Sequence, residues 1–373
     1  MVEMTNLPED PRPEDSPVSA AIGGGGESWW KIRLALMRRS FRDNWKIFRR
    51  NKVGVFGLVI IAFWGIMAVM PTVFFATGFW TPAVYDPVTG LELDPPTRTM
   101  TMVERITDPN TEIDRRAVLL DGRIPDTLQI GDTFELPLQP APPDGRHWLG
   151  TDPLGRDILS QLMHGARASF FLGIVAAVVT VVIGTTIGSV AAYFGGMVDS
   201  FLMRLADLLI MIPGVALLIV IGAVFTYQLW HLAVVIGVLS GFGGTAIVLK
   251  SQALAVKVKP FIDAARVAGG SARHIIFYHL IPNVMPLSVL YMMFTVTGAI
   301  QSEAVLSFLG IFNTDTSWGL MMNLARTQGY LLQVADFWWL TVPAGLAVTL
   351  LSGAFFLVGR GMDEIVNPRL RRR

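Results

Sequence analysis

The chain is notable first for what it lacks. It has no cysteine among its 373 residues, which excludes disulfides and thiolate metal sites. Only 16% of its residues are charged, against roughly 25% in an ordinary soluble domain. The net charge is +1, so no global field favours nucleic acid as a partner. Since 52% of the residues are hydrophobic, the composition indicates an all-α polytopic membrane protein.

Several motifs of soluble enzymes are also missing. No Gly-x-x-x-x-Gly-Lys-Ser/Thr sequence is present, so the chain has no loop of this type to cradle nucleotide phosphates. His274 and His279 lack the glutamate of a zincin motif, and we interpret them as loop residues rather than metal ligands. The uncharged runs contain only isolated serines and threonines as candidate nucleophiles. We therefore predict a non-catalytic chain without a cofactor of its own, and an intramembrane enzyme stays as the remote alternative.

Long apolar runs predict six membrane spans. A helix needs about 20 apolar residues to cross the hydrocarbon. The 42-residue run Leu208–Leu249 is long enough for two helices, which should turn at the polar break Thr226–His231. The other four predicted spans lie at Val53–Phe75 (in a first transmembrane segment, 53–80), Ala168–Val198, Asn283–Ser302 and Phe337–Gly359.

The charges between the spans predict an orientation. Lys31–Lys52 has nine Lys or Arg against one acid, residues 250–279 have five against one, and the tail from Arg360 has five against two. The segment Asp86–Arg146 instead holds twelve acids and six arginines. Because basic segments stay inside, both termini and the 250–279 loop should face the cytoplasm.

The remaining segments complete the predicted organisation. Residues 1–27 lack an apolar core and read as a disordered cytoplasmic tail. Residues 28–52 mix aromatics with cations and favour a basic interfacial helix over a calmodulin-type target or a nucleic-acid patch. Residues 81–147 should form an extracytoplasmic cap with some β structure, the alternative being an insertion without a role. Residues 148–373 should form the core domain, with five of the six spans and a loop at 251–283.

Local chemistry predicts a short helix inside that loop. Pro260 suits the first turn of a helix, and Asp263 near its start complements the helix dipole. Ala264 and Ala265 favour helix with little bulk. Gly269 can adopt positive φ and end the helix.

The chain should then return to the membrane. Ser271 is placed to cap a second helix, and Pro282 marks where the chain turns into the next span. Together the two segments predict a small, smooth-faced helix beside a glycine joint, suited to a groove on another protein. An ordinary loop with two capped helices is the alternative.

The stretch from Asp263-Ala264-Ala265 through Gly269 to Pro282 resembles the cytoplasmic loop by which the membrane subunit of a bacterial ABC importer contacts its ATPase. Further segments resemble the second permease subunit of the oligopeptide, dipeptide and nickel family. The similarity covers roughly residues 45–70 and 147–373. The further matching segments are His147–Asp157, Gly165–Ser169, Tyr193–Asp199, Met203-Arg204 with Asp207, Ser302–Gly310, Ser317–Gly319 and Asn367–Arg371.

The resemblance implies a type I ABC importer permease in the bacterial inner membrane. Expected partners are a homologous permease subunit, two cytoplasmic ATPases that bind ATP and Mg, and an extracytoplasmic binding protein. The expected cargo is a short peptide, with nickel, glutathione or an oligosaccharide as alternatives. Asp263 stands where the family usually has Glu, and Asn367 where it usually has Asp. The outer loop is longer than in many relatives.

Three further predictions concern polar and small residues in the spans. Arg204 and Asp207 have the spacing of an ion pair on one helix face, with a proton relay as the alternative. Glu303 should either line the translocation path or anchor the outer end of a helix. Small residues at helix-packing spacing should allow close helix contacts, namely Gly184, Gly188, Ala192, Gly237 and Gly241.

Overall fold

The computed structural model describes residues 42, 45–91, 97–101, 133–137, 139–225, 228–312 and 314–366. The predicted tail 1–27, most of the predicted interfacial helix 28–52 and the Asn367 segment lie outside these residues. Within them, five helices are long and apolar enough to cross a membrane, or six if one bent pair counts as a single span. The predicted fold class of an all-α polytopic membrane protein is confirmed.

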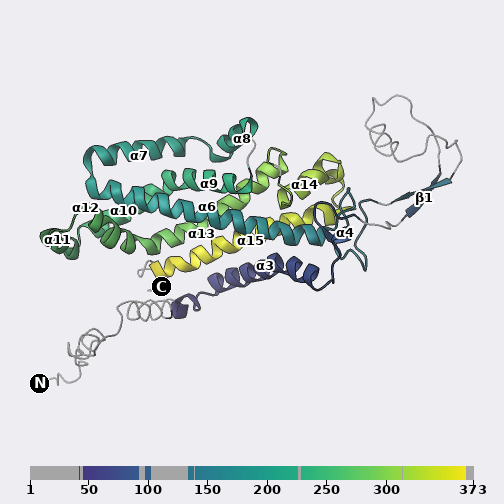
Figure 1. Ribbon diagram of the computed structural model, residues 1–373, viewed down its shortest axis with the longest axis horizontal. Helices are drawn as coiled ribbons and strands as arrows, with labels where there is room; N and C mark the ends of the chain where they lie inside the picture. Colours follow the sequence, from purple (N-terminus) through teal and green to yellow (C-terminus); the bar gives the residue numbers. More distant parts are fainter. Residues whose placement is uncertain are drawn as a thin grey trace, which may run out of the picture.

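Long helices lie side by side along the longest axis of the molecule (Figure 1). The spans are α3 (Lys52–Ala76), α6 (Ile158–Phe194), the bent pair α7 (Gly196–Met211) and α8 (Gly214–Val224), α9 (Leu229–Ser240) with η2 (Gly241–Thr245) and α10 (Ala246–Lys257), α13 (Ile281–Phe308) and α15 (Trp338–Val366).

Short elements lie at the two ends of this bundle. One end carries α11 (Pro260–Val267) and α12 (Ala272–His274), followed by the π-helical η3 (Ile275–Leu280). The opposite end, here called the outer end, carries α4 (Pro82–Tyr85), α14 (Trp318–Thr327) and the 3-10 turn η4 (Tyr330–Gln333).

The outer insertion contains a two-stranded antiparallel sheet. Strand β1 (Thr97–Thr101) pairs with β2 (Thr133–Pro137), with Thr97 opposite Pro137 and Thr101 opposite Thr133. These strands confirm that the insertion has β structure. The remainder of the predicted cap, at 92–96, 102–132 and 138, lies outside the described residues.

The third span differs from its prediction, which placed a helix start near Leu208. Helix α7 begins at Gly196, and it meets α8 at an angle of 82°. The break falls at Ile212, whose ψ of 123° is extended. Pro213 causes this break because proline disfavours helical backbone at the residue before it. Helix α8 ends at Val224 and α9 begins at Leu229, so the predicted turn between these helices is confirmed.

Helix α6 begins at Ile158, ten residues before the predicted start at Ala168. Asp157 caps it, since its carboxylate accepts a hydrogen bond from the Ser160 amide at 2.6 Å. A helix of 37 residues is roughly 55 Å long, well beyond the hydrocarbon thickness of about 30 Å. Polar Gln161 and Arg167 therefore fit its outer part.

Small residues bring α6 close to α9 and α10, as their spacing predicts. A Cβ added to Gly237 would meet the Ala176 carbonyl at 2.8 Å, and one added to Gly188 would meet the Lys250 amide at 2.7 Å. The hydroxyl of Thr180 donates to the carbonyl of Gly237 at 3.1 Å. Inside a lipid bilayer the hydrophobic effect does not favour helix association, so the close approach of the backbones stabilises the helix contacts through van der Waals packing.

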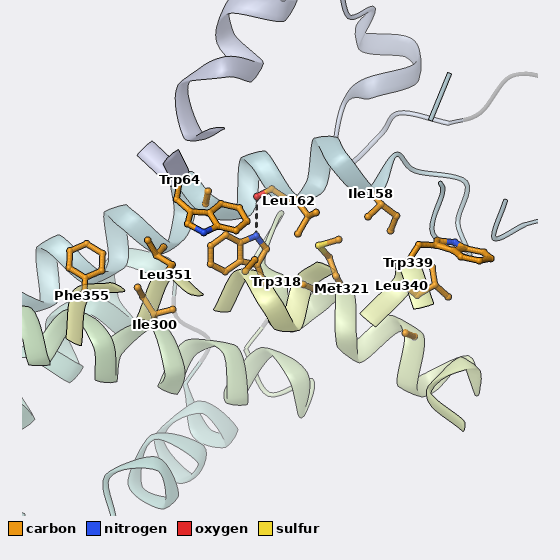
Figure 2. Packing of buried hydrophobic residues seen from close by; sticks show 14 of the residues in the cluster. Trp64, Ile158, Leu162, Ile300, Trp318, Met321, Trp339, Leu340, Leu351 and Phe355 are labelled. Atoms are coloured by element: carbon orange, nitrogen blue, oxygen red, sulfur yellow. Dashed lines mark hydrogen bonds between the residues drawn. The ribbon is translucent and has the colours of Figure 1, made fainter. Parts of the chain in front are cut away.

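The largest apolar cluster fills the outer half of the bundle. Trp318 of α14 is fully buried and its ring centroid lies 5.0 Å from that of Trp64 on α3. Figure 2 shows the Trp318 indole N–H pointing to the carbonyl oxygen of Leu162, at 2.9 Å. Gly165 leaves room for the indole, because an added Cβ would meet it at 2.6 Å. This cluster joins α3, α6, α13, α14 and α15.

Candidate functional site

The predicted loop helix is α11, at the end of the bundle opposite α14 (Figure 1). Pro260 occupies its first turn as predicted, and Asp263 lies in that turn. The helix ends in a Schellman motif, in which Gly269 N–H donates to the Arg266 carbonyl and Gly270 N–H to the Ala265 carbonyl, both at 2.9 Å. Gly269 has a φ of +84°, so the positive φ predicted for this residue is confirmed.

One apolar side chain anchors α11 to the bundle. Ile262 is completely buried and packs in a cluster with Leu249 and Val256 of α10, Ile275 and Leu280 of η3, and Val284 of α13. Burying such a side chain contributes roughly 1.5–3 kcal/mol. The anchor therefore links the helix to the neighbouring ends of α10 and α13.

The rest of α11 faces outward. Val267 is 90% exposed and Asp263 is 65% exposed, and Ala264 lies beside them on the surface. Arg266 Nη1 lies 2.9 Å from Asp263 Oδ1, a surface pair that contributes little to stability. Val258, just before the helix in the chain, and Tyr278, in η3, are also exposed, with fractions of 77% and 72%. We call this surface, formed by Val258, Phe261, Asp263, Ala264, Val267 and Tyr278, the α11 face.

Two cations tie the loop to the end of α6. Lys257 Nζ donates to the carbonyls of Ala192 and Tyr193, each at 2.8 Å. The Arg266 guanidinium lies 5.7 Å from the centre of the Tyr193 ring. Sequence reasoning missed Lys257, because its partners lie more than 60 residues away and no local pattern indicates them. A cation at a helix C-terminus also complements the helix dipole.

The return to the membrane differs from its prediction at Pro282. Ser271 caps the next helix as expected, accepting from the His274 amide at 3.3 Å. From Ala272, however, one continuous helix runs to Phe308, and Pro282 lies exposed inside it without a turn. The π-helical η3 ends two residues before this proline. Asn283 Nδ2 donates to the His279 carbonyl at 2.7 Å and helps to satisfy the backbone there.

The two histidines of this region lie close together, with ring centroids 5.4 Å apart. His274 stacks on Tyr278 at 4.8 Å. Within the described part of the chain, no group of three or more His, Asp or Glu residues has the arrangement of a metal site.

Glu303 lies at the outer end of α13 and is buried, with 4% of its surface exposed. Its Oε1 accepts hydrogen bonds from Ser307 Oγ at 2.7 Å and Ser317 Oγ at 2.5 Å. Ser317 is also the N-cap of α14, through the Gly319 amide at 3.0 Å. We call Glu303, Ser307 and Ser317 the outer polar cluster. Its geometry favours the anchoring role predicted for Glu303 over a place on the translocation path.

The predicted ion pair between Arg204 and Asp207 does not form among the described residues. Both side chains are exposed on α7. The ion pair that does form on this helix joins Asp199 Oδ1 to Lys250 Nζ of α10 at 2.5 Å. The i,i+3 spacing permits a pair but cannot reveal that a neighbouring helix offers a cation.

The outer end also holds a buried His–Asp pair. His147 Nδ1 lies 2.8 Å from Asp157 Oδ2, and both side chains are almost fully buried. Nearby, Trp339 Nε1 donates to the Thr151 carbonyl at 3.2 Å. These contacts fold the segment His147–Asp157 against α6 and α15.

Comparison with known proteins agrees with this architecture. Residues 184–372 match the family described as binding-protein-dependent transport system inner membrane component. Residues 40–96 match the N-terminal transmembrane domain of oligopeptide transport permease C.

Individual relatives are named as peptide permeases. The dipeptide transport system permease protein DppC of Bacillus subtilis is 34% identical over 236 residues, covering 63% of this chain and 72% of the relative. The oligopeptide transport system permease protein OppC of the same organism is 34% identical over 62% of this chain and 74% of the relative. The oligopeptide transport system permease protein OppC of Haemophilus influenzae is 34% identical over 61% of this chain and 72% of the relative. The chain therefore belongs to the binding-protein-dependent inner membrane components of ABC transporters, as a C-type permease of the peptide transport group.

Proposed function

We propose that this chain is one of two homologous permease subunits in an ATP-driven importer of short peptides. Two cytoplasmic ATPases bind ATP and Mg, and an extracytoplasmic binding protein delivers the peptide. The names of the relatives, which refer to dipeptides and oligopeptides, favour this cargo over nickel, glutathione or an oligosaccharide.

The observation that carries the proposal is the α11 face. A membrane-embedded chain that leaves Val258 and Val267 largely exposed outside its spans has a surface suited to a protein partner. Ile262 holds that surface on the inner ends of α10 and α13. Movement of an ATPase bound to α11 is therefore transmitted to two spans, which favours exchange between inward- and outward-facing states.

The proposal can be tested by replacing Gly269 with Val. A β-branched residue at φ +84° is strained, at a cost of roughly 1–2 kcal/mol, and distorts the end of α11. In a reconstituted complex of both permeases, the ATPases and the binding protein, we expect normal assembly but uptake of a labelled tripeptide at least tenfold below wild type.

Gly78→Val is the matched control. Gly78 also has positive φ, at +71°, and an added Cβ would meet nothing there, but it lies at the outer end of α3. This variant should retain uptake. Normal uptake by Gly269→Val would exclude α11 as the coupling element. Uptake of nickel but no peptide by the wild type would contradict the proposed peptide cargo.

The orientation needs its own test, since both termini and α11 are proposed to be cytoplasmic. Because the chain has no native cysteine, labelling of a single introduced cysteine shows on which side of the membrane that position lies. In intact cells, after permeabilisation of any outer membrane, Gly145→Cys should react with a membrane-impermeant thiol reagent. Ala272→Cys should not, and the reverse labelling would invert the topology.

A further inference from the structure

A groove of about 450 Å³ lies between α13 and α15. Its lining includes Thr297, Gln301, Thr349, Ser352 and Gly353, and none of the lining residues carries a charge. Gln301 lies seven residues before the end of α13, roughly 10 Å along the helix. Thr349 lies eleven residues after the start of α15, roughly 16 Å along it. The groove is thus at the depth of the bilayer, in its outer half.

The hydroxyl groups of this groove already have partners in the backbone. Thr297 Oγ1 donates to the carbonyl of Ser352 at 3.0 Å and so joins the two helices. Thr349 Oγ1 donates to the carbonyl of Gly345 at 2.8 Å. The Ser352 hydroxyl donates to the Thr349 carbonyl at 3.4 Å.

Gln301 differs from these neighbours. Its side chain is exposed, and no hydrogen bond to its amide is found within the described part of the chain. A primary amide has two N–H donors and one acceptor oxygen. Leaving these groups against lipid tails is costly, and polar groups inside a membrane usually face a bundle interior or a water-filled cavity. The groove therefore fits a polar occupant better than lipid.

We propose that this groove forms part of the translocation path, and that the Gln301 amide binds the main-chain peptide groups of the cargo. The inference rests on the proposed function and adds the residue and the kind of contact. A peptide group offers one N–H and one carbonyl, which complement the acceptor and donors of a glutamine side chain. Main-chain recognition of this kind is independent of the side chains carried by the peptide.

The surroundings of Gln301 suit varied cargo. The absence of charge in the groove imposes no preference for acidic or basic side chains. Gly298 lies one turn before Gln301, and Gly353 lies on the facing helix. A Cβ added at either position would meet no atom within 4 Å, so space is open beside the amide. The volume of the whole groove also falls within the range of about 300–1,000 Å³ that is typical of ligand sites.

The first experiment measures access to the groove. Gln301→Cys in the assembled transporter should react with a water-soluble maleimide, and saturating tri-alanine with binding protein and ATP should slow the labelling severalfold. Val59→Cys, at an exposed apolar position of α3, is the control for a lipid-facing or subunit-facing site and should not react. Failure of Gln301→Cys to react in any state would place this residue in a dry subunit interface and overturn the proposal.

The second experiment measures transport. Gln301→Leu should lower tri-alanine uptake roughly tenfold, the equivalent of one or two lost hydrogen bonds. Co-purification of the partner permease and ATPase stimulation by the binding protein should remain. Gln328→Leu makes the same chemical change at an exposed position after α14 and should leave uptake unchanged.

These outcomes distinguish a failure of the proposed function from a failure of the Gln301 assignment. If the wild-type complex imports no peptide, the proposed function fails. If the wild type imports peptide and Gln301→Leu imports it equally well, only the assignment of Gln301 fails. Loss of the partner permease from Gln301→Leu would instead identify a subunit contact and would also reject the assignment.

Discussion

The two ends of the bundle are held together by different chemistry. At the outer end, a buried carboxylate and a buried His–Asp pair make specific hydrogen bonds, and two buried indoles donate to carbonyls more than 150 residues away in the sequence. At the α11 end, one isoleucine supplies the apolar anchor and most other side chains of the short helix face outward. The outer end is therefore fixed by many interlocking contacts, whereas the α11 end is a small element presented on few contacts.

The largest effect should come from the outer end. Trp318→Ala removes a fully buried indole and its hydrogen bond to Leu162, so we expect a loss of about 3–5 kcal/mol in unfolding free energy. Thermal denaturation of the detergent-solubilised chain measures this loss. Trp148→Ala, at a position 61% exposed on the same end, should change the midpoint little. Equal effects would contradict the idea that buried contacts fix the outer end.

At the other end, Ile262→Ala should cost about 2–3 kcal/mol, the low side of the usual range because α11 lies at the rim of the bundle. The loss should be local, so hydrogen exchange should rise in α11 and stay unchanged in α14. Val267→Ala truncates a side chain that is 90% exposed and serves as the control. Faster exchange in α14 would show that the two ends are not independent.

Substitutions in the outer polar cluster should lower the free energy of unfolding by an intermediate amount. Glu303→Leu leaves the Ser307 and Ser317 hydroxyls without their acceptor, at a cost of about 1–2 kcal/mol. Glu303→Gln keeps an acceptor oxygen and should lose less. Both can be compared by chemical denaturation in detergent. Equal losses for Gln and Leu would mean that the negative charge, rather than hydrogen bonding, holds the two helices.

The smallest effect on stability should come from Asp263→Asn. The carboxylate is 65% exposed and its pair with Arg266 is worth less than about 0.5 kcal/mol. Binding of the purified ATPase to the permease complex should weaken more than stability does. A drop in melting temperature without any change in ATPase binding would make Asp263 a residue of the fold alone.

The sequence predicts features whose causes are local or periodic. The helix at Pro260, its end at Gly269 and the cap at Ser271 follow from neighbouring residues, and all three are present. The glycine spacing on α6 and α9 likewise predicts their close packing. These features need no knowledge of distant segments.

The errors arise where a distant segment decides the outcome. Asp199 pairs with Lys250 of another helix, while the locally spaced Arg204 and Asp207 do not pair. The position of Gln301 in a groove depends on how α15 packs against α13, which no periodicity in either helix gives. Pro282 is tolerated inside a helix because a π-helical stretch and Asn283 accommodate it.

The glycine-rich stretch η2 has a mechanical consequence. Between α9 and α10, Gly243 leaves helical geometry with a ψ of −128°, so the span consists of two rigid rods joined near its middle. Each rod has 12 residues and is roughly 18 Å long. Rotation of α10 by about 10° around this joint displaces its far end, next to α11, by roughly 3 Å. A movement of that size at the α11 end can thus leave α9, and the outer half of the bundle, where they are.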